Sequence, residues 1–196
     1  MKVKVTPSKV HGNVKIPASK SMAHRALICA SLSDGTSLVS NVTNSKDIEA
    51  TVGCMKALGA IIKQIDETTY EVTGTNLFKQ EGSITCNANE SGSTLRFLIP
   101  LAACTNAKVK FLGQGRLLQR PMDVYANEFK KQNIEFNQSD KEIIVSGNLQ
   151  TKDYVVQGDI SSQFITGFMF VLPLLGQDST PVSYTHLRAH ETGAIS

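Results

Sequence analysis

Three strongly apolar stretches recur along the chain, and each follows a short polar cluster. The stretches read ALICASL, LRFLIPLAAC and FITGFMFVLPLL, and the clusters before them begin at Ser21, Ser91 and Ser161, seventy residues apart. Segments that are apolar nearly all round favour helices buried in a core. We therefore expect three buried helices, each beginning at a polar cluster.

A second pattern, also repeated, fills the intervals between these helices. It consists of a strand, a helix with one polar face and two further strands, with alternating polar and apolar positions in the strands. The predicted ranges are 37–42, 47–58, 60–65 and 69–74 in the first set, and 109–113, 121–132, 134–138 and 142–147 in the second. Asp47 and Asp123, each near the start of its helix, are 76 residues apart. The pattern predicts an α/β fold of repeated βαβαββ units, with a truncated third unit because no strand, second helix or hairpin is expected after Leu175.

If the units are related by pseudo-symmetry, the three buried helices run parallel and their first turns meet. Ser21, Gly92 and Ser162 would then share one cleft. The first turn of a helix has unpaired N–H groups and a partial positive charge, which attract phosphate or carboxylate. The alternative for each cluster is that its Ser is only a helix N-cap. Three such turns, two of them with cations, favour an anion site.

Composition narrows the class of ligand and the compartment. The net charge of +3 is spread over the chain without a basic run, so we expect small anionic ligands and no nucleic acid. No secretory signal is visible and the longest apolar stretch is too short to cross a bilayer, so no membrane association is expected. Four cysteines without a CxxC pair are expected to be reduced core residues of a cytoplasmic protein: Cys29, Cys54, Cys86 and Cys104.

Four motifs in order resemble the 5-enolpyruvylshikimate-3-phosphate synthase family. They are IPASKSMAHRALICASLSDG, NESGSTLRFLIPLAA, GQGRLLQRPMDVY and GDISSQFITGFMFVLPLL, and the resemblance extends from about Val3 to Leu175. It implies an inside-out α/β fold of two domains with three βαβαββ units each. The implied reaction transfers the enolpyruvyl group of phosphoenolpyruvate to the 5-hydroxyl of shikimate 3-phosphate and releases phosphate. It implies no metal and no organic cofactor, and we expect the full-length protein to be monomeric.

The resemblance also implies roles for particular residues. Lys20 would contact both substrates and help to move a proton as the catalytic residue. The implied ligands of shikimate 3-phosphate are Lys20, Ser21, Arg25, Ser161, Ser162 and Gln163, and those of phosphoenolpyruvate are Lys20, Gly92, Arg120 and Gln163. These types suit the task, because an Arg fork binds carboxylate or phosphate and a Gly lets the backbone approach a ligand closely.

Other residues near the motifs receive simpler expectations. His24 is expected on the helix surface, although it is next to Arg25, and Arg116 in solvent. Arg96 is expected either in a structural ion pair or as a support behind the ligands. Glu90 stands where many family members carry an amide, so a ligand role at this position is in doubt.

The resemblance divides the chain into three parts. Residues 1–14 would form a strand of a second domain, 15–180 an incomplete enolpyruvyl transferase domain, and 181–196 a non-native tail. The tail resembles a translated sequencing adapter, with an ordinary linker as the alternative, so His186, Arg188 and His190 carry no functional argument. Because the second domain would supply the remaining catalytic groups, the 196-residue chain is expected to be inactive alone.

Two other functions remain open at this point. The sister enolpyruvyl transferase that acts on UDP-N-acetylglucosamine shares the fold, but normally has Asn where Ser21 follows Lys20, and commonly has a loop cysteine that GQGRLLQRP lacks. A non-catalytic module that binds a phosphorylated ligand is the second alternative.

Overall fold

A computed structural model gives the three-dimensional structure of the chain. It describes residues 16–150, 154–157, 161–176 and 181–184, together with residues 4, 7, 9, 11–14 and 178. The strand expected over 1–14 falls mainly on residues outside this part, as do His186, Arg188 and His190.

The elements follow one another in the predicted order. The first set is α1 (Lys20–Leu32), β1 (Thr36–Val39), α2 (Lys46–Ala57), β2 (Ile61–Gln64) and β3 (Tyr70–Thr73). The second is η1 (Leu77–Lys79), β4 (Glu81–Asn87), α3 (Gly92–Ala102), β5 (Asn106–Leu112), η2 (Leu117–Gln119), α4 (Asp123–Lys130), β6 (Glu135–Gln138) and β7 (Ile143–Ser146). The third is β8 (Tyr154–Gln157), α5 (Ser162–Val171), η3 (Leu172–Leu175) and β9 (Pro181–Tyr184).

Sheet topology confirms the repeat. One sheet has the order β1-β3-β2 and the other β4-β5-β7-β6, so β5-β7-β6 reproduces the antiparallel arrangement of the first sheet. β4 joins β5 in parallel through α3, which is the usual crossover between parallel strands. The segment from β4 to β7 is therefore one complete βαβαββ unit.

The third unit differs from the prediction after Leu175. A strand was not expected there, but β9 pairs with β8 in parallel, from Tyr154 opposite Pro181 to Gln157 opposite Tyr184. That expectation was wrong. The β8–α5–β9 segment repeats the β4–α3–β5 crossover, and the Val and Tyr of β9 are residues that favour strands.

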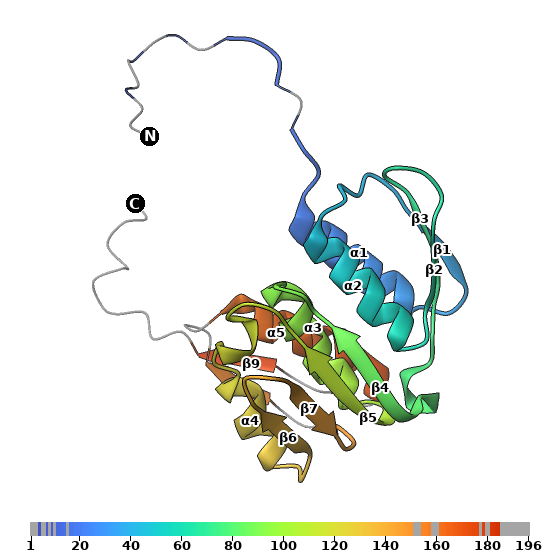
Figure 1. Cartoon of the computed structure of the whole chain (residues 1–196), viewed down its shortest axis with the longest axis vertical. Coiled ribbons are helices and arrows are strands. Elements are labelled where there is room, and N and C mark those ends of the chain that lie inside the picture. Colours follow the sequence, from blue (N-terminus) through green and yellow to red (C-terminus); the bar gives the residue numbers. More distant parts are fainter. Residues whose placement is uncertain are drawn as a thin grey trace.

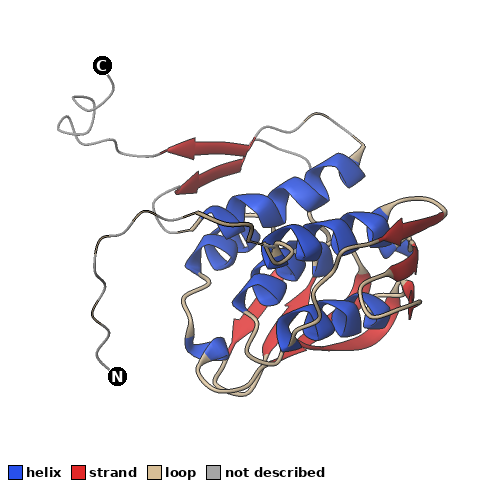
Figure 2. Ribbon diagram, turned by 90° about the horizontal axis from the view of Figure 1, so that it is seen from above, coloured by secondary structure: helices blue, strands red, loops and turns tan. Residues whose placement is uncertain are grey.

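Most of the helices lie in the middle of the molecule, with strands on more than one side of them (Figure 2), whereas α4 lies at the lower edge next to β6 (Figure 1). Figure 1 shows α1 and α2 next to the sheet of β1, β3 and β2, and α3 and α5 next to the four-stranded sheet. α3 is flanked by the other helices, and its side chains from Phe97 to Ala102 are all buried, as predicted. The prediction that α1 and α5 are buried all round was wrong, because Met22 is 62% and Met169 59% exposed. Cys29 on α1 is exposed too, whereas the other three cysteines are buried as expected.

The buried helices run parallel, which confirms the predicted geometry. Between α3 and α5, Ser93 meets Gln163 in the first turns, and Phe97 packs on Phe170 further along, with ring centroids 5.6 Å apart. On the other side of α3, the Arg25 guanidinium of α1 lies 5.2 Å from the centre of the Phe97 ring. Equivalent ends of the three helices therefore lie side by side.

Candidate functional site

Each of the three polar clusters forms a capped first turn. The hydroxyls of Ser19, Ser91 and Ser161 accept a hydrogen bond from the backbone N–H of Met22, Thr94 and Gln163, respectively. The N-cap interpretation is thus correct for Ser91 and Ser161. It does not oppose anion binding, because a hydroxyl that accepts from the backbone still has its own proton to donate to a ligand.

The first turns of α3 and α5 are joined through the amide of Gln163. Its Nε2 donates to the hydroxyl of Ser93 at 2.8 Å, and its Oε1 accepts from Nη1 of Arg96 at 2.7 Å. Both ends of the amide are engaged, so its orientation is fixed. Of the two alternatives for Arg96, the contact with Gln163 supports a role behind the ligands.

The first turn of α1 reaches the same place through Arg25. The guanidinium donates to the backbone carbonyl of Ser21 at 2.9 Å and to the hydroxyl of Thr166 on α5 at 3.4 Å. Sequence reasoning did not find Thr166. The signal was present, since it is a polar residue one turn beyond Ser162 within an otherwise apolar stretch.

Arg120 comes to this site from the loop after β5. A Cβ built on Gly92 would overlap Nη1 of Arg120, so the Arg120 guanidinium can take this position only because residue 92 has no side chain; Nη1 of Arg96 would lie 3.4 Å from the same Cβ. Gln138 of β6 holds this loop in place, because its Nε2 donates to the backbone carbonyl of Arg120 at 2.9 Å. Arg120 has an extended backbone, which the following Pro121 favours.

The site carries an excess of uncompensated positive charge. Within the described part of the chain, Arg25, Arg96 and Arg120 form no ion pair with a carboxylate. Burial lowers the pKa of Arg96, and the nearby charge of Arg120 lowers it further. Clustered guanidinium groups without carboxylates are suited to bind anions.

Lys20 lies next to an acidic residue of the neighbouring helix. Its Nζ forms an ion pair of 2.5 Å with Asp47, the first-turn acid of α2. The lysine side chain is 55% exposed, and it keeps two further protons for a ligand. Asp47 is thus at the predicted helix start, but its pairing with Lys20 was not predicted.

Two further expectations meet different outcomes. His24 was expected on the helix surface, and this was wrong, because it is 1% exposed and faces α2. Its ring contacts Thr51 and the edge of Phe97 rather than solvent. Arg116 is exposed, as expected, and Glu90 is also exposed, with its carboxylate next to Gly115.

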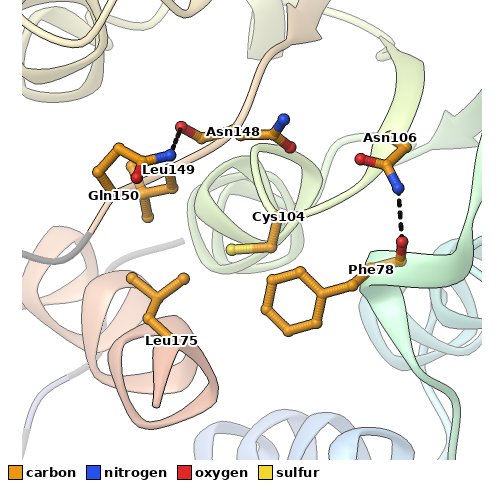
Figure 3. A pocket seen from close by; sticks show the side chains of 7 residues that line it. All are labelled: Phe78, Cys104, Asn106, Asn148, Leu149, Gln150 and Leu175. Carbon is orange, nitrogen blue, oxygen red and sulfur yellow. Dashed lines mark hydrogen bonds between the residues drawn. The ribbon is translucent and has the colours of Figure 1, made fainter. Parts of the chain in front are cut away.

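One hollow lies at the opposite ends of these helices. A hollow of about 480 Å³ lies beyond the last turn of α3, lined by Phe78, Cys104, Asn106, Asn148, Leu149, Gln150 and Leu175 (Figure 3). It has no charged lining residue, and amides of Asn106 and Gln150 already donate to backbone carbonyls. This hollow therefore offers no charged group for an anion, unlike the face at the other ends of the helices, where Arg25, Arg96 and Arg120 lie.

Two other kinds of site were sought within the described residues. No helix there is long and apolar enough to cross a membrane. No three His, Cys, Asp or Glu side chains in that part of the chain are grouped so that they could hold a metal ion.

Comparison with known proteins agrees with the motifs and the fold. The family described as EPSP synthase (3-phosphoshikimate 1-carboxyvinyltransferase) matches residues 5–190. A 3-phosphoshikimate 1-carboxyvinyltransferase of Clostridium perfringens (strain SM101 / Type A) is 46% identical over 190 residues, which cover 96% of this chain and 45% of the relative. The protein of the same name from Clostridioides difficile (strain 630) is 44% identical, with 95% and 45% covered.

A solved structure supports the fold. EPSP synthase from Acinetobacter baumannii superposes with a TM-score of 0.73 at 20% identity, covering 92% of this chain and 42% of that one. The chain spans about 45% of the length of the curated relatives that it matches. The family match reaches residue 190, so it includes part of the segment predicted to be a non-native tail, and that prediction stays a prediction. By sequence match and fold, the chain belongs to the EPSP synthase family.

Proposed function

We propose that the whole protein transfers the enolpyruvyl group of phosphoenolpyruvate to the 5-hydroxyl of shikimate 3-phosphate, with release of phosphate. One observation carries the proposal: the first turns of three helices and the Arg120 loop converge, and three arginines there have no carboxylate partner within the described residues. Both substrates are anions. The names of the curated relatives, which describe this activity, also support it.

The arrangement suggests how the two anions divide the site. Ser161 and Ser162 at the start of α5, with Ser21 and Arg25 of α1, would hold shikimate 3-phosphate. A phosphate there would receive hydroxyl and guanidinium hydrogen bonds together with the N-terminal charge of a helix.

Phosphoenolpyruvate would lie between Gly92 and Arg120. A planar guanidinium can bind a carboxylate or phosphate through two parallel hydrogen bonds, and the glycine lets the backbone approach the ligand. Gln163 and Lys20 would lie between the two substrates, and Lys20 would have to share or leave its ion pair with Asp47 to reach them. Such fixed charges hold both reactants in place as charge develops during transfer.

We further propose that this chain supplies one wall of the site and that transfer needs groups from outside the 196 residues. The test is calorimetric titration of the chain with shikimate 3-phosphate, alone and with phosphoenolpyruvate, with phosphate release measured in parallel. Binding without phosphate release supports the proposal. Phosphate release by the 196-residue chain would disprove the requirement for outside groups, and tighter binding of UDP-N-acetylglucosamine would favour the sister enzyme.

The same assay on a longer protein that contains this sequence tests the activity. Binding of shikimate 3-phosphate without phosphate release in that longer chain would favour a non-catalytic binding module.

A further inference from the structure

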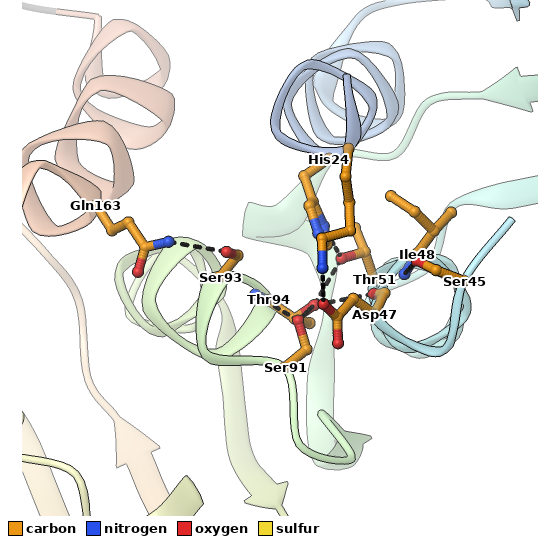
Figure 4. A network of polar contacts seen from close by, with 10 residues as sticks. His24, Ser45, Asp47, Ile48, Thr51, Ser91, Ser93, Thr94 and Gln163 are labelled. Carbon is orange, nitrogen blue, oxygen red and sulfur yellow. Dashed lines mark hydrogen bonds and ion pairs between the residues drawn. The ribbon is translucent and has the colours of Figure 1, made fainter. Parts of the chain in front are cut away.

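A chain of buried hydrogen bonds joins the first helix to the cap of the third. Nδ1 of His24 lies 2.7 Å from the hydroxyl of Thr51, and this hydroxyl lies 2.7 Å from that of Thr94. The Thr94 hydroxyl is in turn 2.7 Å from the hydroxyl of Ser91, the N-cap of α3. The links span α1, α2 and α3 (Figure 4).

All four side chains are withdrawn from solvent. The exposed fractions are 1% for His24, 0% for Thr51 and Thr94, and 2% for Ser91. A buried polar group that loses its partner costs about 1–3 kcal/mol, so the four groups hold one another in place. These hydrogen bonds thus fix the distance between α1 and the start of α3.

Each hydroxyl has only one proton to donate, and this restricts the direction in which the four groups donate their hydrogen bonds. Ser91 accepts from the backbone N–H of Thr94 at 3.2 Å and also from the Thr94 hydroxyl. The Thr94 hydroxyl has a second acceptor, the backbone carbonyl of Asp47, at 3.3 Å. If Thr94 donates its one proton to Ser91 or to this carbonyl, Thr51 must donate to Thr94, and His24 must donate to Thr51 from Nδ1. In this arrangement Nε2 of His24 is an acceptor, and it has no partner among the described residues.

Burial favours a neutral His24 ring at pH 7. Burial lowers the pKa of His24 to about 4, the charges of Lys20 and Arg25 lower it, and Asp47 acts in the opposite direction. A neutral ring has one donor nitrogen and one acceptor nitrogen, so the tautomer is set by the hydrogen bond at Nδ1.

The two ends of the hydrogen-bond chain, His24 and Ser91, lie directly next to the candidate anion site. His24 precedes Arg25 and is one turn after Lys20, and Ser91 precedes Gly92. Thr51 is also one turn after Asp47, which pairs with Lys20, so α2 holds the first turn of α1 at two points. A change of spacing here would move the α1 cations relative to Gly92 and Arg120.

We infer that the hydrogen-bond chain His24–Thr51–Thr94–Ser91 positions the α1 and α3 parts of the anion site relative to each other. None of the four side chains needs to contact the substrate for this role. The substrate used in the test rests on the proposed function, but a second measurement needs no ligand.

The variants are Thr51→Val, which removes the hydroxyl and nearly keeps the shape, and Thr51→Ser, which keeps the hydroxyl. Thr85→Val, at an exposed position of β4, controls for the same chemical change elsewhere. Without the Thr51 hydroxyl the α1 cations are no longer held at their distance from Gly92, so Thr51→Val is expected to weaken shikimate 3-phosphate binding about tenfold. Thr51→Ser should restore wild-type affinity to within about twofold.

Calorimetry with the 196-residue chain measures these affinities, and urea titration of each variant gives the folded fraction used to correct them. Equal binding by Thr51→Val and wild type would overturn the inference. If the wild type itself fails to bind, the proposed function fails for this chain, and the inference is decided by NMR without ligand.

The NMR measurement follows the backbone amides of Gly92 and Ser93 and the nitrogens of His24. We expect a neutral His24 with its proton on Nδ1, and amide signals that shift in Thr51→Val and return in Thr51→Ser. Unmoved amides of Gly92 and Ser93 in Thr51→Val would overturn the inference. Loss of folding would instead change signals throughout the spectrum, which separates it from a local change.

Discussion

Gln163 donates a hydrogen bond to Ser93, and the two residues are seventy positions apart, the spacing between the polar clusters. The sequence period therefore appears in space as a direct contact between equivalent turns of α3 and α5. Because the same amide accepts from Arg96, Gln163 both joins two helices and orients a guanidinium. The free energy of unfolding therefore depends on the link that Gln163 makes between α3 and α5, whereas anion binding depends on the guanidinium that it orients.

Gln163→Glu separates these two dependences. A carboxylate would pair with Arg96, so the free energy of unfolding should stay the same or rise by up to about 1 kcal/mol. The added negative charge would repel a bound anion, so the affinity for shikimate 3-phosphate should fall about tenfold. Urea unfolding and calorimetry measure the two effects. Gln64→Glu, the same change at an exposed position of β2, should alter neither by much; a parallel fall in stability and affinity for Gln163→Glu would contradict the prediction.

Gly92→Ala should displace Arg120 without unfolding the chain. The new methyl group would occupy the place of the Arg120 guanidinium, which is the end of a flexible exposed side chain and can move away. We expect the affinity for phosphoenolpyruvate to fall about tenfold, with a change of less than about 1 kcal/mol in the free energy of unfolding. Calorimetry in the presence of shikimate 3-phosphate tests the first point.

The control for Gly92→Ala is Gly53→Ala. Gly53 lies inside α2, and its added Cβ would meet nothing within 4 Å. Because alanine favours a helix over glycine by about 1 kcal/mol, this variant should be more stable and bind normally. A second check is Arg120→Ala, after which Gly92→Ala should have little further effect on affinity. Additive losses in the double variant would show that the two residues act separately.

Gly167→Ala should loosen the contact between α3 and α5. The added Cβ would overlap the hydroxyl of the buried Tyr125 and lie 2.8 Å from the carbonyl oxygen of Arg96. Neither is a flexible end, since the Tyr125 hydroxyl itself donates to that carbonyl at 2.7 Å. We expect the free energy of unfolding to fall by about 2 kcal/mol in urea titrations. Tyr125→Phe in the same chain should recover part of the loss, and no recovery would place the cause elsewhere.

The repeat and the helix starts could be predicted because both are local. Neighbouring residues show the apolar period, the N-cap serine and the first-turn acid. The helices of the structure begin at or next to the predicted residues. The parallel packing followed from the symmetry of the units. The convergence of Arg25, Gly92 and Gln163 was therefore within reach of sequence reasoning.

The pairing of Lys20 with Asp47 and the burial of His24 were not within reach. Both depend on which face of α1 meets α2, and the contacting residues are 27 positions apart. The local sequence around a histidine in an apolar helix does not show whether its side chain is exposed or buried. The Arg120 guanidinium over Gly92 likewise depends on the path of the whole loop after β5.

His24 gives the chain a pH-dependent stability with a defined direction. Its pKa is about 4 in the folded chain and 6.5 as the ordinary value, because burial disfavours the charged ring. The unfolded chain therefore binds the proton first as the pH falls from about 6.5 towards 4. Stability from this group is complete above about pH 6.5 and is lost as the pH falls to the folded pKa.

Between pH 7 and pH 5, this difference corresponds to a loss of about 2 kcal/mol in the free energy of unfolding. Urea titrations of the wild type and of His24→Gln at both pH values isolate the effect, because all other titrating groups are shared. The charged groups that face His24 are Asp47 from α2 and Lys20 and Arg25 from α1, and all three are present in both chains. The wild type should lose about 2 kcal/mol more than the variant. An equal pH dependence in the two chains would mean that burial does not lower the pKa of His24 in the folded chain.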